Sequence, residues 1–359
     1  MTNETSKKAL IAMSGGVDSS VAAYVMKSRG FDCMGCTMRL YENDIIGEDI
    51  FGTCCSKKDT DDARAVCERI GIDYRIFHYE IEFREKVIEP FVCSYERGET
   101  PNPCIRCNRY LKFDLLYRKA KELGYENIVT GHYARIEERD GLFYLRKAMD
   151  RNKDQSYVLY DMTQEQLAHT FFPLGDLTKA HARRIAEENG FVNSHKKDSQ
   201  DICFVPDGDY AGMIRRYRGK DYPAGDFVDL DGNVLGRHTG IIGYTIGQRR
   251  GLGIPADRRL YVKRIDAENN RVILADDEDL YDREVMVRDF HWITGEVPTG
   301  EYRCSARIRY RHTEQPATLT VLSGGEARIL FDEPVRAATP GQSAVLYDDD
   351  IVLGGGIIQ

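Results

Sequence analysis

The sequence predicts an α/β N-terminal domain built on a parallel sheet, followed by an all-β region. Up to about residue 205, short apolar segments alternate with segments of helical spacing, which is typical of a parallel sheet covered by helices on both faces. Beyond that point, short alternating segments separated by Gly and Asp turns favour small β-barrels or sandwiches. An acidic stretch near residue 275 indicates a further domain boundary.

Length and composition set the broad class of protein. A chain of 359 residues is too long for one ordinary core, so two or three domains are expected. The composition is 42% hydrophobic and 30% charged, with a net charge of −8, and no apolar run is long enough to span a bilayer. Because the N-terminus also lacks a secretory signal, we expect a cytoplasmic protein without a membrane partner. Its ten cysteines are then not expected to form a structural disulfide framework.

The elements of the first domain can be placed by their hydrophobic periodicity. The pattern predicts strands at 8–13, 31–38, 73–77 and 127–130. It predicts helices at 19–29, 59–70 and 113–123, and a further helix that follows the strand at 73–77 and leads towards Pro90. Open α/β sheets bind ligands at the carboxyl ends of their strands. Met38, which ends the second strand, and Gly131-His132, which follow the fourth, are therefore candidate site residues.

A glycine-rich turn joins the first strand to the first helix. It reads S-G-G-V-D-S from Ser14 to Ser19, and its two glycines allow successive N–H groups to form an anion-binding nest above the helix N-terminus. The two serines add hydroxyl donors. The motif is not a Walker loop, because no lysine follows it. A plain strand-to-helix turn with serine as the helix cap is the alternative interpretation.

This motif resembles the PP-loop of the ATP pyrophosphatase superfamily, whose members have an adenine nucleotide alpha hydrolase-like fold and cleave ATP between the α- and β-phosphates. The resemblance implies ATP and Mg²⁺ as cofactors. It implies that Gly15, Gly16, Asp18 and Ser19 hold the phosphates, and that Asp18 also helps to place Mg²⁺. The further nucleotide contacts that it implies are Ala12, Met13, Ser14, Val17, Met38 and Gly131.

Five further motifs narrow the resemblance. They are T-P-N-P-x-x-x-C-N at 100–108, T-G-H-Y-A-R at 130–135, K-D-Q-S-Y at 153–157, D-S-Q-D-I-C-F at 198–204 and G-Q-R-R-G-L at 247–252. In this order they are similar to those of the tRNA-specific 2-thiouridylases, which replace O2 of the wobble uridine with sulfur. The resemblance implies a PP-loop catalytic domain at 1–205, a small central β domain at 206–275 and a tRNA-contacting C-terminal β-barrel at 276–359.

The same resemblance implies the partners. They are the tRNAs for Lys, Glu and Gln, and a sulfur donor such as a cysteine desulfurase or a sulfur relay protein. Two other functions remain open from the residues alone. One is another PP-loop synthetase acting on a small molecule, and the other is an RNA-binding module whose loop merely holds a nucleotide.

Sulfur transfer to a uracil carbonyl needs two converging thiols. The carbonyl oxygen must first be adenylated to become a leaving group, and sulfur must arrive as a persulfide. A second thiol then helps to release that sulfur, leaving a disulfide bond that is later reduced. The resemblance implies that Cys203 carries the persulfide and that Cys107 is the nucleophile. Lys196 and Lys197 would favour a Cys203 thiolate if they lie close to it.

Cys104 departs from the family pattern, in which Asp often stands three residues before the nucleophile. The resulting C-x-x-C opens a second mechanism, in which Cys104, Cys107 and Cys203 hold three corners of a [4Fe–4S] cluster. Zinc held by Cys33, Cys36 and the C-x-x-C ranks lowest, because a predicted strand would point the first two thiols in different directions unless it breaks at Gly35. Cys54-Cys55 is expected to be a simple loop.

Several polar residues are expected to face the tRNA. By resemblance, Asn102, Pro103, Cys104 and His132 lie at the target base, while Lys153, Asp154, Gln155, Arg309, Tyr310 and Gln342 contact the tRNA. For the K-D-Q run at 153–155, the alternative is a solvated helix start capped by Asp154. In A-R-I-R-Y-R at 306–311, a strand would place three arginines on one face as a phosphate-binding stripe, with pairing to nearby acids as the alternative.

Overall fold

The computed structural model of the protein describes residues 7–41, 57–198, 202–297 and 299–359. These residues pack as two compact units. The first holds the chain up to Val87, Cys104–Gly208 and Asp350–Val352, and the second holds Ile88–Pro103, Asp209–Asp349 and Leu353–Gln359. Cys54-Cys55 and residues 199–201 of the polar run before Cys203 lie outside the described residues.

The first unit is built on a five-stranded parallel sheet, which confirms the predicted α/β class. Its strand order is β3-β2-β1-β4-β7, and all four pairings are parallel. The strands are β1 Lys8–Ala12, β2 Asp32–Arg39, β3 Asp73–His78, β4 Asn127–Val129 and β7 Thr170–Phe171. β1 occupies the middle of this order, so the turn that leaves its carboxyl end lies over the centre of the sheet edge.

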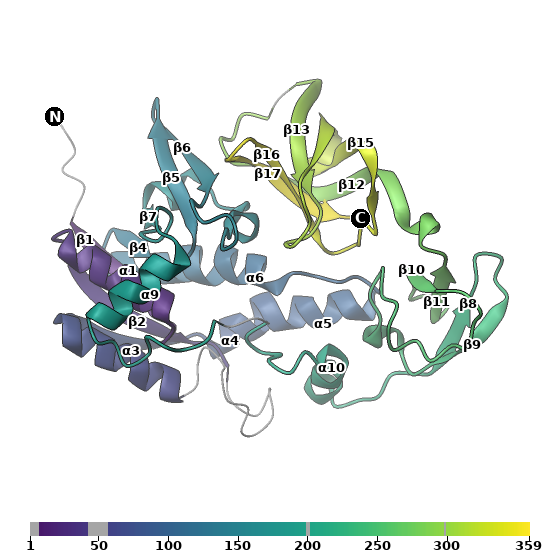
Figure 1. The fold of residues 1–359 in the computed structure, drawn as a ribbon, viewed down its shortest axis with the longest axis horizontal. Helices are drawn as coiled ribbons and strands as arrows, with labels where there is room; N and C mark the ends of the chain where they lie inside the picture. The colour runs from purple at the N-terminus through teal and green to yellow at the C-terminus, as the bar shows by residue number, and fades with distance from the viewer. Residues whose placement is uncertain (1–6, 42–56, 199–201, 298) are drawn as a thin grey trace. The chain divides into compact units, whose positions relative to one another are not determined.

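Three helices cover one face of this sheet, namely α1 Val17–Ser28, α3 Lys57–Ile70 and α9 Lys179–Glu188 (Figure 1). Their apolar sides share one buried cluster with alternate residues of β1, including Ala9 and Ile11. Each helix contributes small or branched side chains, such as Val21, Val66 and Ala182, so the helices approach the sheet closely. The first and the last described α-helix of this unit, α1 and α9, therefore meet, and Asp18 and Lys179, which pair between them, are 161 positions apart.

Two helical stretches differ from their expected limits. The helix that leads towards Pro90 continues beyond it, as α4 Glu80–Phe83, a π-helical segment Arg84–Ile88 and α5 Glu89–Glu96. Pro90 lies inside this continuous helical stretch, so its missing N–H leaves the Lys86 carbonyl without a backbone donor from position 90, and Arg106 donates to that carbonyl at 2.8 Å instead. The helix expected at 113–123 begins earlier, as α6 Pro103–Arg106, a π-helical segment Cys107–Leu115 and α7 Leu116–Glu122. π-Helical turns are rare and occur frequently at functional sites.

The remaining elements of the first unit are short. A β-hairpin follows β4, in which β5 and β6 pair antiparallel around an Asp140-Gly141 turn with both residues at positive φ. The bounds are β5 Ala134–Arg139, β6 Leu142–Lys147, a 3₁₀ turn Ser156–Leu159 and α8 Gln164–Ala168.

The second unit contains two β structures and two flanking helices, α5 and α10 Tyr210–Arg218. A four-stranded sheet of order β10-β11-β8-β9 forms the central domain, with 3₁₀ turns at Ile241–Gly243 and Glu278–Leu280. Its strands are β8 Gly225–Val228, β9 Val234–His238, β10 Tyr261–Asp266 and β11 Arg271–Ala275. This sheet confirms the prediction that a small β domain follows the first domain.

The C-terminal strands close into a six-stranded barrel, as predicted. The order β12-β15-β14-β13-β16-β17 is closed by pairing of β12 with β17. The elements are β12 Tyr281–Trp292, β13 Glu301–Arg307, β14 Gln315–Val321, a 3₁₀ turn Ser323–Gly325, β15 Ala327–Arg336, β16 Ser343–Asp348 and β17 Ile351–Ile358. Closure leaves no exposed edge within the barrel, and an apolar cluster fills its interior.

The arginine stripe expected at 306–311 is not formed. β13 ends at Arg307, so Arg309 and Arg311 lie in the turn that follows rather than on one face of a strand. Arg307 pairs with Glu314 at 2.7 Å, as the alternative interpretation proposed. Arg309 donates to the carbonyl of Ala337 and, at 2.9 Å, to the hydroxyl of Thr339. Strand periodicity failed here because the chain must turn back to reach β14.

Candidate nucleotide and sulfur-transfer site

The S-G-G-V-D-S turn lies between β1 and α1, above the helix N-terminus. Gly15 has φ of +70°, a conformation that favours glycine, and Gly16 occupies the N-cap position without a side-chain cap. The Ser19 hydroxyl accepts from the Ser14 N–H at 3.2 Å and donates to the Gly16 carbonyl at 3.1 Å. The N-terminus of this 12-residue helix carries a partial positive charge, so the turn is suited to bind an anion.

Two glycines of the site allow backbone to approach backbone. A Cβ atom on Gly15 would collide with the backbone of Asp59 at the start of α3. A Cβ atom on Gly131 would lie 2.7 Å from the Ser19 nitrogen and 2.8 Å from the Asp18 carbonyl carbon. The loop that follows β4 therefore lies directly against the start of α1, as expected for residues at the carboxyl edge of the sheet.

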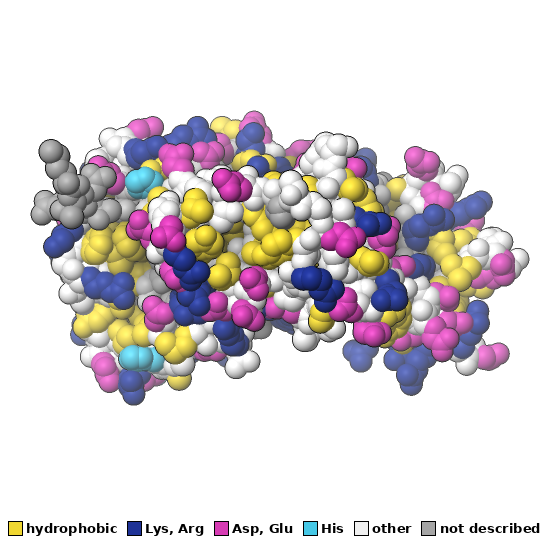
Figure 2. All heavy atoms as spheres, turned by 90° about the horizontal axis from the view of Figure 1, so that it is seen from above, with side chains coloured by type: hydrophobic (Ala, Val, Ile, Leu, Met, Phe, Trp, Pro, Cys, Tyr) yellow, Lys and Arg dark blue, Asp and Glu magenta, His cyan; other side chains and the backbone are white. Residues whose placement is uncertain are grey.

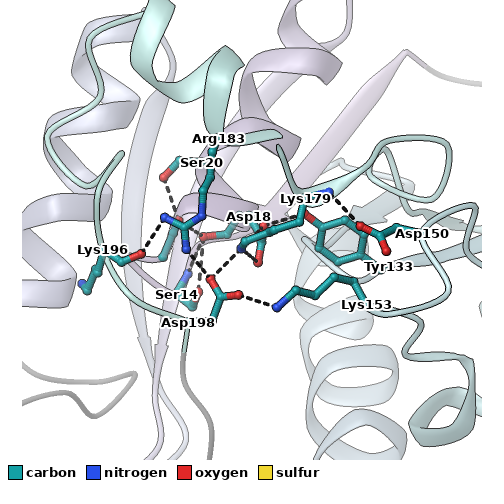
Figure 3. Close-up of polar contacts among 12 residues, drawn as sticks. Ser14, Asp18, Ser20, Tyr133, Asp150, Lys153, Lys179, Arg183, Lys196 and Asp198 are labelled. Carbon is teal, nitrogen blue, oxygen red and sulfur yellow. Dashed lines mark hydrogen bonds and ion pairs between the residues drawn. The ribbon is translucent and has the colours of Figure 1, made fainter. Parts of the chain in front are cut away.

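Asp18 belongs to an ion-pair network that brings together four distant segments (Figure 3). The Lys179 ammonium, from the first turn of α9, lies 2.8 Å from both Asp18 carboxylate oxygens. It also lies 2.7 Å from Asp198, which pairs in turn with Lys153 at 2.8 Å and Arg183 at 2.9 Å. Figure 3 shows Lys179 between the two carboxylates. The network connects the PP-loop turn to the chain segment that leads towards Cys203.

Burial and the charges of this network fix the protonation states of Tyr133 and Asp198. Tyr133 donates its hydroxyl to Asp18 at 2.8 Å, and burial followed by the Asp18 charge raises the Tyr133 pKa well above its ordinary value. Burial opposes ionisation of Asp198, but hydrogen bonds from Lys153 and Lys179 outweigh it and lower the Asp198 pKa. Tyr133 therefore stays a neutral donor, and Asp198 stays an anion.

A second set of contacts braces the turn from the segment after α9. The Asn193 amide donates to the Gly15 carbonyl at 3.0 Å and to Ser20 at 2.9 Å, and Lys196 donates to the same carbonyl at 3.0 Å. Lys196 also pairs with Asp59 and, at 2.9 Å, with Asp62. The Lys196 ammonium is therefore bound to two carboxylates, and its expected effect on the Cys203 thiolate stays a prediction.

His132 is buried beneath the sheet edge, with 8% of its surface exposed. One ring nitrogen lies 2.6 Å from the Thr130 hydroxyl, and the other lies 3.5 Å from the Lys112 ammonium. Burial, and then the Lys112 charge, lowers the His132 pKa well below its ordinary value. A neutral ring that accepts from Lys112 and donates to Thr130 satisfies both contacts. Its expected contact with the target base remains a prediction.

The K-D-Q run is held by the protein itself. Asp154 is buried and accepts from the Ala148 N–H at 2.9 Å and the Ser156 hydroxyl at 2.8 Å. The Gln155 side chain accepts from the Tyr133 N–H at 2.9 Å. Lys153 pairs with Asp198 and keeps 37% of its side-chain surface exposed, so it is more accessible to tRNA than the buried Asp154.

The proposed nucleophile lies where an α-helical turn becomes a π-helical segment. Cys104 is on α6 and exposed, and Cys107 begins the π-helical segment and is partly buried. Residues three apart on a helix share a face, so these two thiols are neighbours on α6 and its continuation. On either side, Arg106 donates to the Lys86 carbonyl at 2.8 Å, and Asn108 donates to the Val158 carbonyl at 2.9 Å.

Cys203 is partly buried and its backbone is fixed to the carboxyl end of β2. The Tyr41 hydroxyl donates to the Cys203 carbonyl at 2.9 Å. The next residue, Phe204, is buried and packs edge-to-face against Phe83 at the end of α4. Lys86, which accepts from Arg106 beside Cys107, lies three residues after Phe83. The neighbours of both thiols are thus attached to one helical turn at 83–86.

Cys33 and Cys36 behave as core residues. β2 is unbroken through Gly35, so thiols three positions apart point to opposite faces of the sheet. Burial raises the Cys33 pKa to about 11 and raises that of Cys36 further still. This arrangement does not provide a zinc clip. Across the described ranges as a whole, no three His, Cys, Asp or Glu side chains are grouped so that they could hold a metal ion.

Comparison with known proteins covers almost the whole chain. Residues 7–207 match the model described as tRNA methyl transferase HUP domain, 212–276 the tRNA methyl transferase PRC-barrel domain, and 282–358 the aminomethyltransferase beta-barrel domain. The chain is 47% identical over 355 residues to the tRNA-specific 2-thiouridylase MnmA of Clostridioides difficile, with 98% of each chain covered. The chain belongs to the tRNA-specific 2-thiouridylase family.

Other members of this family are similarly close. The Clostridium botulinum relative of the same name is 45% identical and covers 99% of this chain and 98% of its own, and that of Acetivibrio thermocellus is 46% identical and covers 98% and 99%. Among solved structures, NMN synthetase from Francisella tularensis is 16% identical, covers 62% of this chain and 81% of its own, and has a TM-score of 0.34. That likeness is too low to support an inference.

The surface charge and the hydrophobicity of the helices both bear on what this chain binds. On the face drawn in Figure 2, Lys and Arg side chains are interspersed with Asp and Glu side chains, so charge alone does not mark a tRNA path on that face. None of the helices in the described part of the chain is long and apolar enough to cross a membrane.

Sequence reasoning missed Lys179 and Asn193, and it did not assign a role to Tyr133 or Asp198. Lys179 had one local signal, because it follows a Thr178 N-cap and so places a cation in the first turn of a helix, where the helix dipole disfavours it. A lysine tolerated there indicates a nearby anion. Tyr133 and Asp198 fall within the motifs at 130–135 and 198–204, but their partners, like those of Asn193, lie far away in sequence and no local pattern predicted the pairings.

Proposed function

We propose that this protein is an ATP-dependent tRNA sulfurtransferase that replaces O2 of the wobble uridine with sulfur. The observation that carries the proposal is the match, along almost the whole chain, to relatives named tRNA-specific 2-thiouridylase. The expected acceptors are the tRNAs for Lys, Glu and Gln. The expected sulfur donor is a cysteine desulfurase or a sulfur relay protein.

In the first half-reaction, the uracil O2 attacks the α-phosphate of ATP and pyrophosphate leaves. The S-G-G-V-D-S turn supports this step, because it places a glycine-rich backbone at the N-terminus of α1, an arrangement that favours binding of phosphate groups. Mg²⁺ is usually bound by one or two carboxylates together with substrate phosphates. The Asp18 carboxylate fits that donor chemistry, and 31% of its side-chain surface is exposed. A bound Mg²⁺ would neutralise phosphate charge.

In the second half-reaction, the Cys203 persulfide attacks C2 of the adenylated uracil and AMP leaves with the former O2. Cys107 then attacks the Cys203 sulfur, so that the persulfide S–S bond breaks and its electron pair remains on the thiouridine sulfur. A Cys107–Cys203 disulfide forms, and a thiol reductant must return two electrons before the next turnover. Attachment of the segments beside both thiols to the 83–86 turn supports their convergence.

Dependence of ATP cleavage on tRNA tests this function. We expect the purified protein to form AMP and pyrophosphate only when unmodified tRNA is present, because the uracil oxygen is the nucleophile. Labelled ATP and thin-layer separation of the products measure this. Turnover at the same rate without tRNA would instead indicate a PP-loop synthetase acting on a small molecule. Binding of tRNA with no cleavage would indicate an RNA-binding module.

The shared helical face of Cys104 and Cys107 favours one alternative mechanism, in which these thiols and Cys203 hold a [4Fe–4S] cluster. Their sulfur donors suit iron, but the three do not form a grouped metal site among the described residues. We therefore expect anaerobically purified protein to be colourless and to thiolate tRNA without iron. About four irons per chain, lost in Cys104→Ala together with activity, would establish the cluster mechanism instead.

A further inference from the structure

The loop at 339–342, between β15 and β16 of the C-terminal barrel, grips the segment that precedes the T-P-N-P motif. The Thr100 N–H donates to the Pro340 carbonyl at 2.8 Å, and the Gln342 side-chain amide donates to the Thr100 carbonyl at 2.8 Å. Both backbone groups of one residue are therefore bonded to the same barrel loop. Thr100 also donates its hydroxyl to Thr245 of the central domain at 3.5 Å.

The barrel loop itself is fixed, and it approaches the segment closely. The Gly341 N–H donates to the Ile358 carbonyl at 2.9 Å, and the Ile358 N–H donates to the Gln342 carbonyl at 2.8 Å. Gly341 has φ of +90°, and a Cβ atom there would lie 3.0 Å from both the Glu99 Cβ and the Thr100 nitrogen. The atoms that such a Cβ would meet belong to the backbone or lie next to it, so they cannot rotate away.

Glu99 adds an electrostatic contact between the same two parts of the second unit. Its carboxylate pairs with Arg97 at 2.8 Å and with Arg288 of β12 at 3.3 Å, and 16% of its side-chain surface is exposed. Its N–H donates to the Ser94 carbonyl at 2.9 Å, which ties it to the end of α5. The segment at 99–100 is thus held by the barrel on one side and by α5 on the other.

The chain between this grip and the proposed catalytic thiol has little freedom to absorb a displacement. Pro101 and Pro103 fix their own φ angles, and each restricts the residue before it, so four consecutive residues from Thr100 are stiffened. Pro103 begins α6, and Cys107 follows immediately after α6 ends. A shift of Thr100 is therefore passed along the backbone to Asn102, Pro103 and the start of α6.

We infer that the 339–342 loop is a positioning device for the base-binding segment, and that Gly341 and Gln342 act on the reaction through Thr100. This inference rests on the proposed function, since it assigns the gripped segment to the target base. It gives the C-terminal barrel a part in chemistry in addition to any contact with tRNA. It also gives Gln342 an intramolecular partner in place of its expected direct tRNA contact.

The test compares Gly341→Ala with Gly324→Ala. Gly324 also has positive φ, at +73°, and lies in the same barrel, but a Cβ atom there meets nothing within 4 Å. Both variants carry similar backbone strain, whereas only Gly341→Ala presses on Glu99 and Thr100. We expect single-turnover thiolation of tRNA to fall about tenfold or more in Gly341→Ala, because small misplacements at a reacting centre are costly, and to stay within about twofold in Gly324→Ala.

Gln342→Met separates positioning from direct tRNA contact. Methionine keeps the length of the side chain but removes the donor to the Thr100 carbonyl. We expect the single-turnover rate at saturating tRNA to fall while the tRNA dissociation constant and its salt dependence stay unchanged. We also expect faster amide hydrogen exchange in the peptide that contains Thr100. Gln342→Lys, which restores a donor, should recover part of the rate.

Two results would overturn the inference. One is an unchanged saturating rate with weakened tRNA binding in Gln342→Met, which would make Gln342 a tRNA contact. The other is unchanged thiolation in Gly341→Ala, which would show that the grip is dispensable. Wild-type protein that fails to thiolate tRNA in the parallel reaction would instead overturn the proposed function.

Discussion

Cys203→Ser is expected to lower sulfur transfer to tRNA by about a thousandfold or more, because a hydroxyl cannot carry a persulfide and loss of a covalent participant removes the reaction path. Cys107→Ser is expected to lower it similarly, since no thiol then breaks the persulfide bond. Both variants should still release pyrophosphate when tRNA is added, because adenylation uses neither thiol. Labelled sulfur in the tRNA and labelled pyrophosphate, followed in one reaction, measure the two half-reactions.

Cys304→Ser is the matched control for these variants. Cys304 is partly buried in the barrel, where its thiol lies 3.7 Å from the Ala317 carbonyl, a contact that serine can keep. The Cys304→Ser variant should transfer sulfur to tRNA at the wild-type rate. Full thiolation by Cys203→Ser would contradict the assignment of the persulfide to this residue. Loss of pyrophosphate release in both variants would show that the thiols act earlier than proposed.

Asp18→Asn is expected to lower tRNA-dependent pyrophosphate release by about a hundredfold or more, since a few kcal/mol of charge stabilisation are lost with the carboxylate. The variant should remain folded, because Lys179 keeps its contact with Asp198 at 2.7 Å and the amide oxygen still accepts from Tyr133. Pyrophosphate release at increasing Mg²⁺ concentration measures the effect. We expect the Mg²⁺ requirement to rise in the variant.

Asp114→Asn is a suitable control for this substitution. It also removes a carboxylate that pairs with a cation, here Arg118 at 2.6 Å, but both side chains lie exposed on the surface of the same unit. Exposed pairs contribute little, so activity and Mg²⁺ dependence should not change. An Asp18→Asn protein with wild-type rates at low Mg²⁺ would contradict the assigned role.

The sequence predicted those parts of the protein that depend on local pattern. Alternating strands and helices predicted the parallel sheet, and the glycine pair at Gly15-Gly16 predicted the tight turn between β1 and α1, since both follow from backbone rules over a few residues. The short strands of the C-terminal region predicted a barrel or a sandwich, and the resemblance to the family selected the barrel. Each of these features is encoded within one stretch of chain.

The features that sequence could not supply depend on pairing between distant residues. Lys179 and Asp18 lie 161 positions apart, and no local rule connects them. The arginine stripe was wrong for a related reason, because the position at which β13 ends is set by the turn to β14 rather than by the alternation of its side chains. The π-helical start at Cys107 likewise had no signal, since hydrophobic periodicity does not distinguish a π-helical segment within a helix.

The most direct measurement is the nucleoside composition of tRNA after one turnover of protein whose Cys203 has been loaded as a persulfide. With ATP, Mg²⁺ and unmodified tRNA, we predict one 2-thiouridine at the wobble position and one AMP for each persulfide consumed. Mass spectrometry of digested tRNA and of the protein, which should contain a new Cys107–Cys203 disulfide, measures both products. AMP formed without 2-thiouridine, or 2-thiouridine formed without loss of the persulfide, would contradict the account.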